Sequence, residues 1–169
     1  MYDVASILLI WPLCLVSVLL HELGHALGYR ITGGKAELKI RAGSGPIILN
    51  TAKFTFCLLP VGGYFDPREE PGTRKAKLAT LTGGPFVSLL LAALFCACCF
   101  CFAGFMDPGS ALYEVLFPVS RFLMFLNFFQ FLFTAVPMRY RVVCRGLDSD
   151  GLQIVRTLKH EKVQQENGK

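Results

Sequence analysis

Three apolar stretches constrain the fold of this chain more than any other feature. They cover residues 4–29, 79–105 and 112–136. Each is long enough to cross about 30 Å of hydrocarbon as a helix that rises roughly 1.5 Å per residue. The composition agrees, because the 169 residues are 53% hydrophobic and 17% charged, whereas soluble domains carry about 25% charged residues. We therefore expect a mainly α-helical membrane protein, with three transmembrane helices in one domain that covers residues 1–169.

The first apolar stretch could instead be a secretory signal peptide. No basic residue precedes it, and no cleavage site of small residues ends it. Cleavage after this stretch would also remove a histidine motif from the mature chain. We therefore expect the stretch to remain in the protein as a membrane span.

Lysine and arginine residues are distributed unevenly around the expected spans. Nine of the 17 lie between residues 30 and 77, seven lie from residue 139 onward, and the loop of residues 104–114 carries none. Positive residues accumulate on the cytoplasmic side of membrane proteins. We therefore expect the N-terminus outside, and residues 30–78 and the C-terminal tail in the cytoplasm. Nucleic-acid binding is not expected, because no basic run is interleaved with aromatic residues that could stack on bases.

The segment between the first two spans contains two runs of β-favouring residues. These runs, AELKIRAGSGPIIL and AKFTFCLLPVGGYF, are broken by Gly-Ser-Gly-Pro and Pro-Val-Gly-Gly. The pattern predicts a β-hairpin or small sheet over residues 36–65, lying on the membrane surface. Residues 66–77, with two prolines and several charges, are expected to form a mobile linker. After the third span we expect a short helix following Asp150 and a solvated tail over residues 159–169.

The first span ends in LLHELGHALGYR, residues 19–30, which contains the pattern His-Glu-x-x-His. On a helix, residues four apart share a face, so His21 and His25 can bind one metal ion together. Glu22 projects about 100° around the helix from His21, where it can act as general base on a metal-bound water without being a ligand. Zinc lowers the pKa of bound water far below that of bulk water, to about 7. The motif therefore predicts a hydrolytic zinc site with Glu22 as its catalytic base.

The three ionisable side chains of this motif could instead be polar residues packed between helices. Burying such a group within a membrane span costs a few kcal/mol, and groups of this kind usually have a function. Three of them within about one helical turn favour metal binding and catalysis, in a chain that has only three histidines. Catalytic zinc sites have three protein ligands and one open position, so one more ligand is expected elsewhere in the chain.

Four segments, in chain order, resemble the signatures of the site-2 protease family of intramembrane zinc metalloproteases. HELGHALGYR resembles the first signature, and AGSGPIIL followed by FTFCLLPVGGYF is similar to the family's membrane-associated β-hairpin. LTGGPFVSLLLAAL resembles the second signature. The third, Asn-x-x-Pro with Leu-Asp-Gly downstream, is present in altered form as Thr134-Ala-Val-Pro137 and GLDSDGLQI. The resemblance covers most of the chain and implies the family's three-helix catalytic core, in a minimal form without a PDZ or nucleotide-sensing domain.

The resemblance also implies a role for each matching residue. His21 and His25 would bind one Zn²⁺ per chain, and Glu22 would be the general base. An aspartate of the third signature would be the third ligand. Two aspartates are candidates, because Leu147-Asp148 matches the Leu-Asp half of the family pattern and Asp150-Gly151 matches the Asp-Gly half.

Asp150 is favoured over Asp148 as the third ligand. Apolar residues follow Asp150 as they would in a helix, and Gly151 permits a tight turn beside the metal. Either aspartate could instead cap the N-terminus of a helix, a position that suits this residue type.

Three further small or polar residues could contact the substrate. Gly84 and Ser88 belong to the second signature, in which Ser88 replaces the usual asparagine. They could contact the substrate backbone or a developing oxyanion, or they could serve close packing between helices. Asn127 in the third span is another candidate contact, and its alternative role is a hydrogen bond between helices.

The expected function is that of an intramembrane zinc metalloendopeptidase that cleaves a membrane-embedded protein or peptide. A substrate helix must unwind before its peptide bonds can be attacked, and the hairpin edge could pair with the unwound strand. The small size and the topology suggest the bacterial inner membrane. The altered third signature leaves one alternative, a non-catalytic scaffold that binds transmembrane helices. A transporter or channel is disfavoured, because three spans without repeats do not match an alternating-access architecture.

Overall fold

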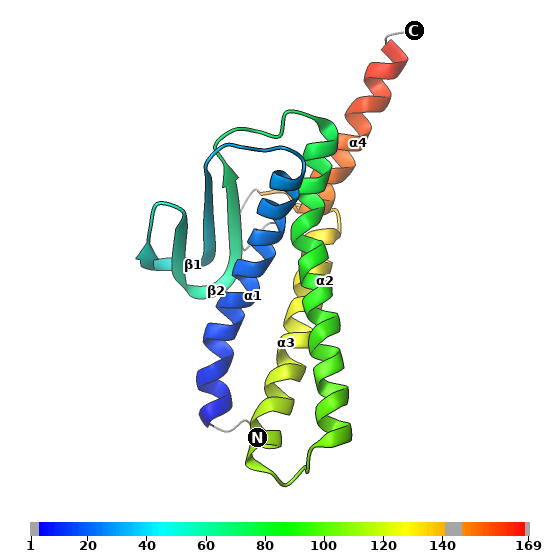
Figure 1. Ribbon diagram of the computed structural model, residues 1–169. Coiled ribbons are helices and arrows are strands. Elements are labelled where there is room, and N and C mark those ends of the chain that lie inside the picture. Colours follow the sequence, from blue (N-terminus) through cyan, green and yellow to red (C-terminus); the bar gives the residue numbers. More distant parts are fainter. Residues whose placement is uncertain (1–3, 141–146, 168–169) are drawn as a thin grey trace.

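The computed structural model describes residues 4–140 and 147–167, and within these ranges the chain forms four helices and a two-stranded sheet. Three helices are long and stand side by side, the hairpin lies along the flank of the first, and the fourth extends from one end of the bundle (Figure 1). In chain order, the elements are α1 (Val4–Ile31), β1 (Leu38–Asn50), β2 (Phe54–Pro67), α2 (Arg74–Phe105), α3 (Ala111–Ala135) and α4 (Asp150–Asn167).

Three helices are long and apolar enough to cross a membrane, namely Leu8–Ile31 of α1 and the whole of α2 and α3. They lie close to the stretches expected from the sequence. The main difference is that α2 begins at Arg74, five residues earlier than expected. The hydroxyl of Thr73 accepts a hydrogen bond from the backbone N–H of Ala76 and thereby caps the helix at this point. Three basic residues expected in a linker therefore lie in the first turns of α2.

The last helix is also longer than expected. We expected a short helix after Asp150 and a solvated tail over residues 159–169, whereas α4 has 18 residues and ends at Asn167. Residues 168–169 of the expected tail lie outside the described part of the chain. Helix α4 contacts α2 and α3 and extends beyond them at one end of the bundle (Figure 1).

The bundle exposes apolar side chains and buries polar ones. Large hydrophobic residues cover the outward faces of the helices, and Phe100 and Phe105 are 76% and 90% exposed. The interior instead holds ionisable and polar side chains such as His21, His25 and Asn127. Such an outer surface suits hydrocarbon, because proteins in water seldom expose large contiguous apolar areas. The arrangement is that of an integral membrane protein.

The two strands pair antiparallel with several shifts of register. Near the start of β1, Ile40 lies opposite Phe65 on one side and Phe54 on the other, so the hairpin folds back upon itself. Gly43 and Gly45 have φ angles of 85° and 80°, in the left-handed region that glycine adopts without steric cost. They permit the bend of β1. The hairpin expected from the sequence is therefore present, and it begins and ends two residues later.

The hairpin is attached along α1. The indole Nε1 of Trp11 donates a hydrogen bond to the carbonyl of Leu58, at 2.9 Å. Trp11 precedes Arg30 by 19 residues, which corresponds to about 28 Å along the helix. Figure 1 shows the hairpin beside α1. Apolar side chains that the hairpin exposes include Ile47, Ile48, Leu49, Leu59 and Val61.

Glycines allow α1 and α2 to approach closely beside the histidine motif. A Cβ atom on Gly24 would lie 2.4 Å from the carbonyl oxygen of Gly83, and one on Gly28 would lie 2.2 Å from that of Ala79. Gly24-x-x-x-Gly28 has the spacing of small residues that lets membrane helices pack backbone to backbone. The spacing of Gly24 and Gly28 within HELGHALG is the sequence signal for this close approach.

Replacing Gly24 with alanine is expected to destabilise the bundle, because the added methyl group would overlap the Gly83 carbonyl. The expected loss of unfolding free energy is about 1–3 kcal/mol, measured by denaturant unfolding in detergent micelles. Gly104→Ala is the matched control, because no atom lies within 4 Å of a Cβ placed at Gly104 on α2. Equal stability of the two variants would contradict the close helix packing.

Candidate metal centre

Two histidines on successive turns of α1 point into the bundle. His21 and His25 are 3% and 6% exposed, and their rings meet edge to face with centroids 4.9 Å apart. Their Nε2 atoms are 3.3 Å apart. The spacing of four residues thus brings one nitrogen of each ring to the same point, as expected for this motif.

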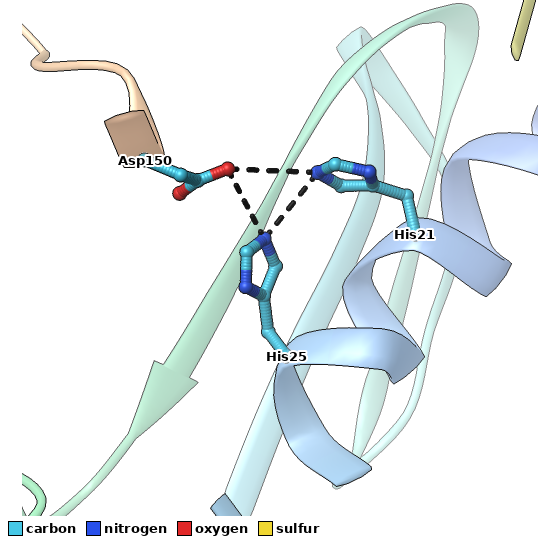
Figure 2. Close-up of side chains that lie close together, drawn as sticks. All are labelled: His21, His25 and Asp150. Atoms are coloured by element: carbon cyan, nitrogen blue, oxygen red, sulfur yellow. Dashed lines mark hydrogen bonds and ion pairs between the residues drawn. The ribbon is translucent and has the colours of Figure 1, made fainter. Parts of the chain in front are cut away.

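The first residue of α4 completes this cluster. The Oδ2 atom of Asp150 lies 3.5 Å from Nε2 of His25 and 3.9 Å from Nε2 of His21. Figure 2 shows the three side chains converging from two helices, with a ring nitrogen or carboxylate oxygen at each corner of a triangle. Among the described residues, these three form a group whose potential ligand atoms all lie within 4.8 Å of one another.

Asp148, the alternative ligand, lies outside this cluster. Its Oδ1 atom accepts a hydrogen bond from Nε of Arg139 at 3.0 Å, and its other oxygen forms an ion pair with Arg156. A β-bridge between Arg139 and Asp148 also links their backbones. The carboxylate of Asp148 therefore links the segment between α3 and α4 to α4 itself. Of the two candidate ligands, Asp150 is the one that lies beside the histidines.

Ser149 fixes the point at which α4 begins. Its side chain, in a residue that is 1% exposed, accepts a hydrogen bond from the backbone N–H of Leu152 at 3.2 Å, as an N-cap residue does. The same hydroxyl donates to the carbonyl of Val136 at 2.7 Å and accepts from the N–H of Met138 at 3.0 Å. It thereby ties the start of α4, and with it Asp150, to the end of α3.

Glycine at position 151 has a different structural role from the one that the sequence suggested. It is the second residue of α4, not part of a tight turn. A Cβ atom here would lie 1.9 Å from the carbonyl oxygen of Ala135. Glycine therefore lets the first turn of α4 pack directly on the last residue of α3, which brings Asp150 close to α1.

The other ring nitrogen of each histidine, Nδ1, has a hydrogen-bond partner on α2. Nδ1 of His25 donates to the carbonyl of Thr80 at 2.8 Å, and Nδ1 of His21 lies 2.8 Å from the hydroxyl of Ser88. A carbonyl oxygen can only accept, so the proton of a neutral His25 ring sits on Nδ1 and its Nε2 lone pair is free. The Ser88 hydroxyl can accept from His21 in the same way. Metal-binding histidines in proteins almost always have such an outer partner.

The donor set fits a zinc ion. With both protons on Nδ1, two lone pairs and one carboxylate oxygen face one another, which is unfavourable without a cation between them. Zinc takes histidine nitrogens and carboxylate oxygens at about 2.0–2.2 Å in tetrahedral geometry, so neighbouring ligand atoms lie roughly 3.3–3.6 Å apart. The three observed separations, 3.3, 3.5 and 3.9 Å, are close to this range. Burial raises the pKa of the Asp150 carboxyl, because desolvation disfavours the charged form.

Glu22 lies beside the cluster without belonging to it. The residue is 5% exposed, and its carboxylate faces Gly63 of β2, where a Cβ atom would lie 2.3 Å from Oε1. Phe65, two residues further along β2, stacks with the His25 ring at a centroid distance of 6.3 Å. The hairpin therefore forms a wall of the site, and Gly63 leaves the room that the Glu22 carboxylate occupies.

Gly84 and Ser88 face the histidines. A Cβ on Gly84 would lie 2.2 Å from Nε2 of His25, and Ser88, with no exposed surface, contacts His21. From the sequence, substrate contact and helix packing were both possible for this pair. In the structure α2 orients the histidine rings through Ser88 and the Thr80 carbonyl, a role that depends on how two helices are paired in space.

Asn127 links α3 to α1. Its Nδ2 donates to the carbonyl of Leu123 at 2.8 Å and to the hydroxyl of Ser17 at 3.2 Å. Ser17 precedes His21 by one helical turn. The structure thus gives Asn127 an interhelical hydrogen bond, which was the alternative to substrate contact.

One family model covers most of the chain. The family model of peptidase family M50 matches residues 10–165, a range that includes the three clustered residues and Glu22. A comparison with curated proteins gives no match. The chain is thus similar to this peptidase family along nearly its whole length.

Asp150→Asn and Asp148→Asn are expected to differ in zinc content. An amide at residue 150 removes the anionic ligand, and zinc affinity should fall by a factor of ten or more, measured by competition with a chromogenic chelator on purified protein. Asp148→Asn is the matched control, since its carboxylate binds two arginines, and its zinc affinity should stay within about threefold of wild type. Loss of zinc from the Asp148 variant alone would contradict this assignment.

Proposed function

We propose that this chain, which belongs to peptidase family M50, the site-2 protease family, is an intramembrane zinc endopeptidase. Its substrate would be a membrane-embedded protein or peptide. The observation that carries the proposal is the convergence of His21, His25 and Asp150 inside an apolar bundle. Buried ionisable groups in a membrane span are costly and usually functional.

His21, His25 and Asp150 would hold one Zn²⁺, and a catalytic site of this kind keeps a fourth position open. When bound, zinc would polarise the substrate carbonyl and lower the pKa of water to about 7. Glu22 would take a proton from the attacking water and deliver it to the leaving amine nitrogen. The burial of Glu22 against β2 supports this role, because it holds the carboxylate in one place.

The hairpin would receive the unwound substrate. A transmembrane helix hides its amides in hydrogen bonds between residues four apart, so a peptide bond must leave the helix before it can be attacked. The Gly63 to Phe65 stretch of β2 borders both Glu22 and His25. We propose that the substrate pairs as a strand with the edge of the hairpin beside this stretch.

The distribution of basic residues supports one orientation of the protein in the membrane. Arg30 lies in the last turn of α1, and three basic residues lie at the start of α2, at the same end of the bundle (Figure 1). We propose that this end faces the cytoplasm, in a bacterial inner membrane. His21 and His25 precede Arg30 by nine and five residues, which places the site about 8 to 14 Å below that surface.

Glu22→Gln tests the proposed function directly. The amide cannot take a proton, so cleavage of a membrane substrate in proteoliposomes should fall by at least a hundredfold. Zinc content should remain near one ion per chain, because Glu22 is not among the clustered ligands. Wild-type protein that holds no zinc and cleaves nothing would favour the alternative, a scaffold that binds helices without cutting them.

Gly63→Ala should separate metal binding from catalysis. The added methyl group would press on the Glu22 carboxylate, and displacing a catalytic group by about 1 Å can cost a hundredfold in rate. Cleavage should therefore drop at least tenfold while zinc content is unchanged. Gly72→Ala is the control, since a Cβ there meets no atom within 4 Å. Unaltered cleavage by the Gly63 variant would argue against Glu22 as the base.

A further inference from the structure

Arg121 is a charged side chain in the middle of a membrane span. It follows Ala111, the first residue of α3, by ten residues and precedes Ala135, the last, by 14. At about 1.5 Å per residue it lies roughly 15 Å from one end of the span, near the centre of a hydrocarbon layer about 30 Å thick. The side chain is exposed on the outside of the bundle, so in a membrane it faces lipid.

An arginine in this position is costly unless it is paired. Insertion scales assign it about 2.5 to 3.5 kcal/mol at the centre of a span. Its guanidinium carbon lies 5.9 Å from the ring centroid of Phe117, one turn away, and the charge also acts on the thiol of Cys99 on α2. Among the described residues, none of the ion pairs involves Arg121. The guanidinium can therefore bind a carboxylate from outside.

An apolar groove lies on the same face of α3. The cavity has a volume of about 340 Å³ and lies between α2 and α3. Met124, Phe125 and Phe128, which line it, follow Arg121 by three, four and seven residues and so share its face of the helix. Across the groove, α2 contributes Leu89 and three smaller residues, Ala92, Ala93 and Cys96. Small residues on one wall are typical of surfaces where membrane helices pack closely.

The groove is separate from the candidate metal centre. The buried residues of α3 are Val119, Ser120, Leu123 and Asn127, and Asn127 faces α1 through Ser17. At about 100° per residue, Arg121 and Phe128 lie on a different side of α3. A helix in the groove would therefore not present its peptide bonds to the histidines, and it would be an accessory partner rather than the substrate.

A second copy of this chain does not fit the groove. Its three spans contain two acidic residues, Glu22 and Glu114. Glu22 is buried, and Glu114 is seven residues from Arg121 in the first turn of α3, about 10 Å away along the axis. Two copies side by side in one membrane would therefore bring no carboxylate to the depth of Arg121.

We propose that the α2 to α3 groove binds a transmembrane helix of another membrane protein, which carries an Asp or Glu near the middle of its span. The apolar face of that helix packs against Phe125 and Phe128, and its carboxylate pairs with Arg121. The charge pair determines which helix binds and at what depth in the membrane, because an unpaired acidic side chain in lipid is as unfavourable as an unpaired arginine.

The test uses single-span Leu/Ala peptides with one Glu or one Gln at the centre. Binding to the labelled full-length protein is measured by energy transfer in phosphatidylcholine vesicles. The Glu peptide is expected to bind roughly 3- to 30-fold more tightly than the Gln peptide. Arg121→Gln should abolish the difference, and Arg121→Lys should retain part of it. Equal binding of the two peptides to the wild type would overturn the proposal and indicate that Arg121 reaches lipid headgroups instead.

Two further variants test the groove itself. Ala93→Phe fills it and should weaken binding of both peptides severalfold. Leu94→Phe is the matched control, since this neighbour is 55% exposed and does not line the groove, and it should bind as the wild type does. Similar binding by both variants would overturn the groove as the site, and Arg121-dependent transfer between two labelled copies would show self-association instead. Zinc content and cleavage do not enter these measurements, so the outcome is independent of the proposed protease function.

Discussion

The burial of ionisable side chains inside an apolar bundle is the constraint on which the rest of this structure depends. His21, Glu22, His25 and Asp150 all lie where water is scarce, and each must therefore find a partner within the protein. Nδ1 of each histidine has a hydrogen-bond partner on α2, and Nε2 points toward the carboxylate of Asp150. This leaves three acceptor atoms facing one another, an arrangement that a divalent cation would stabilise.

Small residues make that arrangement possible at each contact between elements. Gly24 and Gly28 let α1 and α2 touch, Gly63 leaves space for the Glu22 carboxylate, and Gly151 lets α4 reach the end of α3. Ser149 then fixes the first turn of α4 by hydrogen bonds to Leu152 within α4 and to Val136 at the end of α3. The candidate site therefore depends on close backbone approach as much as on its potential ligands.

The sequence predicted the features that depend on local periodicity. The three spans, the hairpin and the shared face of His21 and His25 follow from apolar length, β-favouring runs and the spacing of four residues. The resemblance to the site-2 protease family was confirmed by the match to peptidase family M50. The roles of the ligands and of Glu22 stay predictions.

Features that depend on the pairing of distant elements were not predictable in the same way. The contact of Gly151 with Ala135, the hydrogen bond of Ser88 to His21 and the hydrogen bond of Trp11 to the hairpin each join segments far apart in the chain. Spacing alone left two aspartates as candidates. Their surroundings differ because two arginines bind Asp148, which no local pattern of the sequence indicates.

X-ray absorption at the zinc edge of purified wild-type protein tests the central claim most directly, because it reports the atoms around the metal. One zinc per chain is expected, with a shell of nitrogen and oxygen atoms at about 2.0–2.2 Å and the signal of two imidazole rings. A shell that contains sulfur at about 2.3 Å would assign the metal to cysteines. That result, or protein that binds no zinc, would contradict a site built from His21, His25 and Asp150.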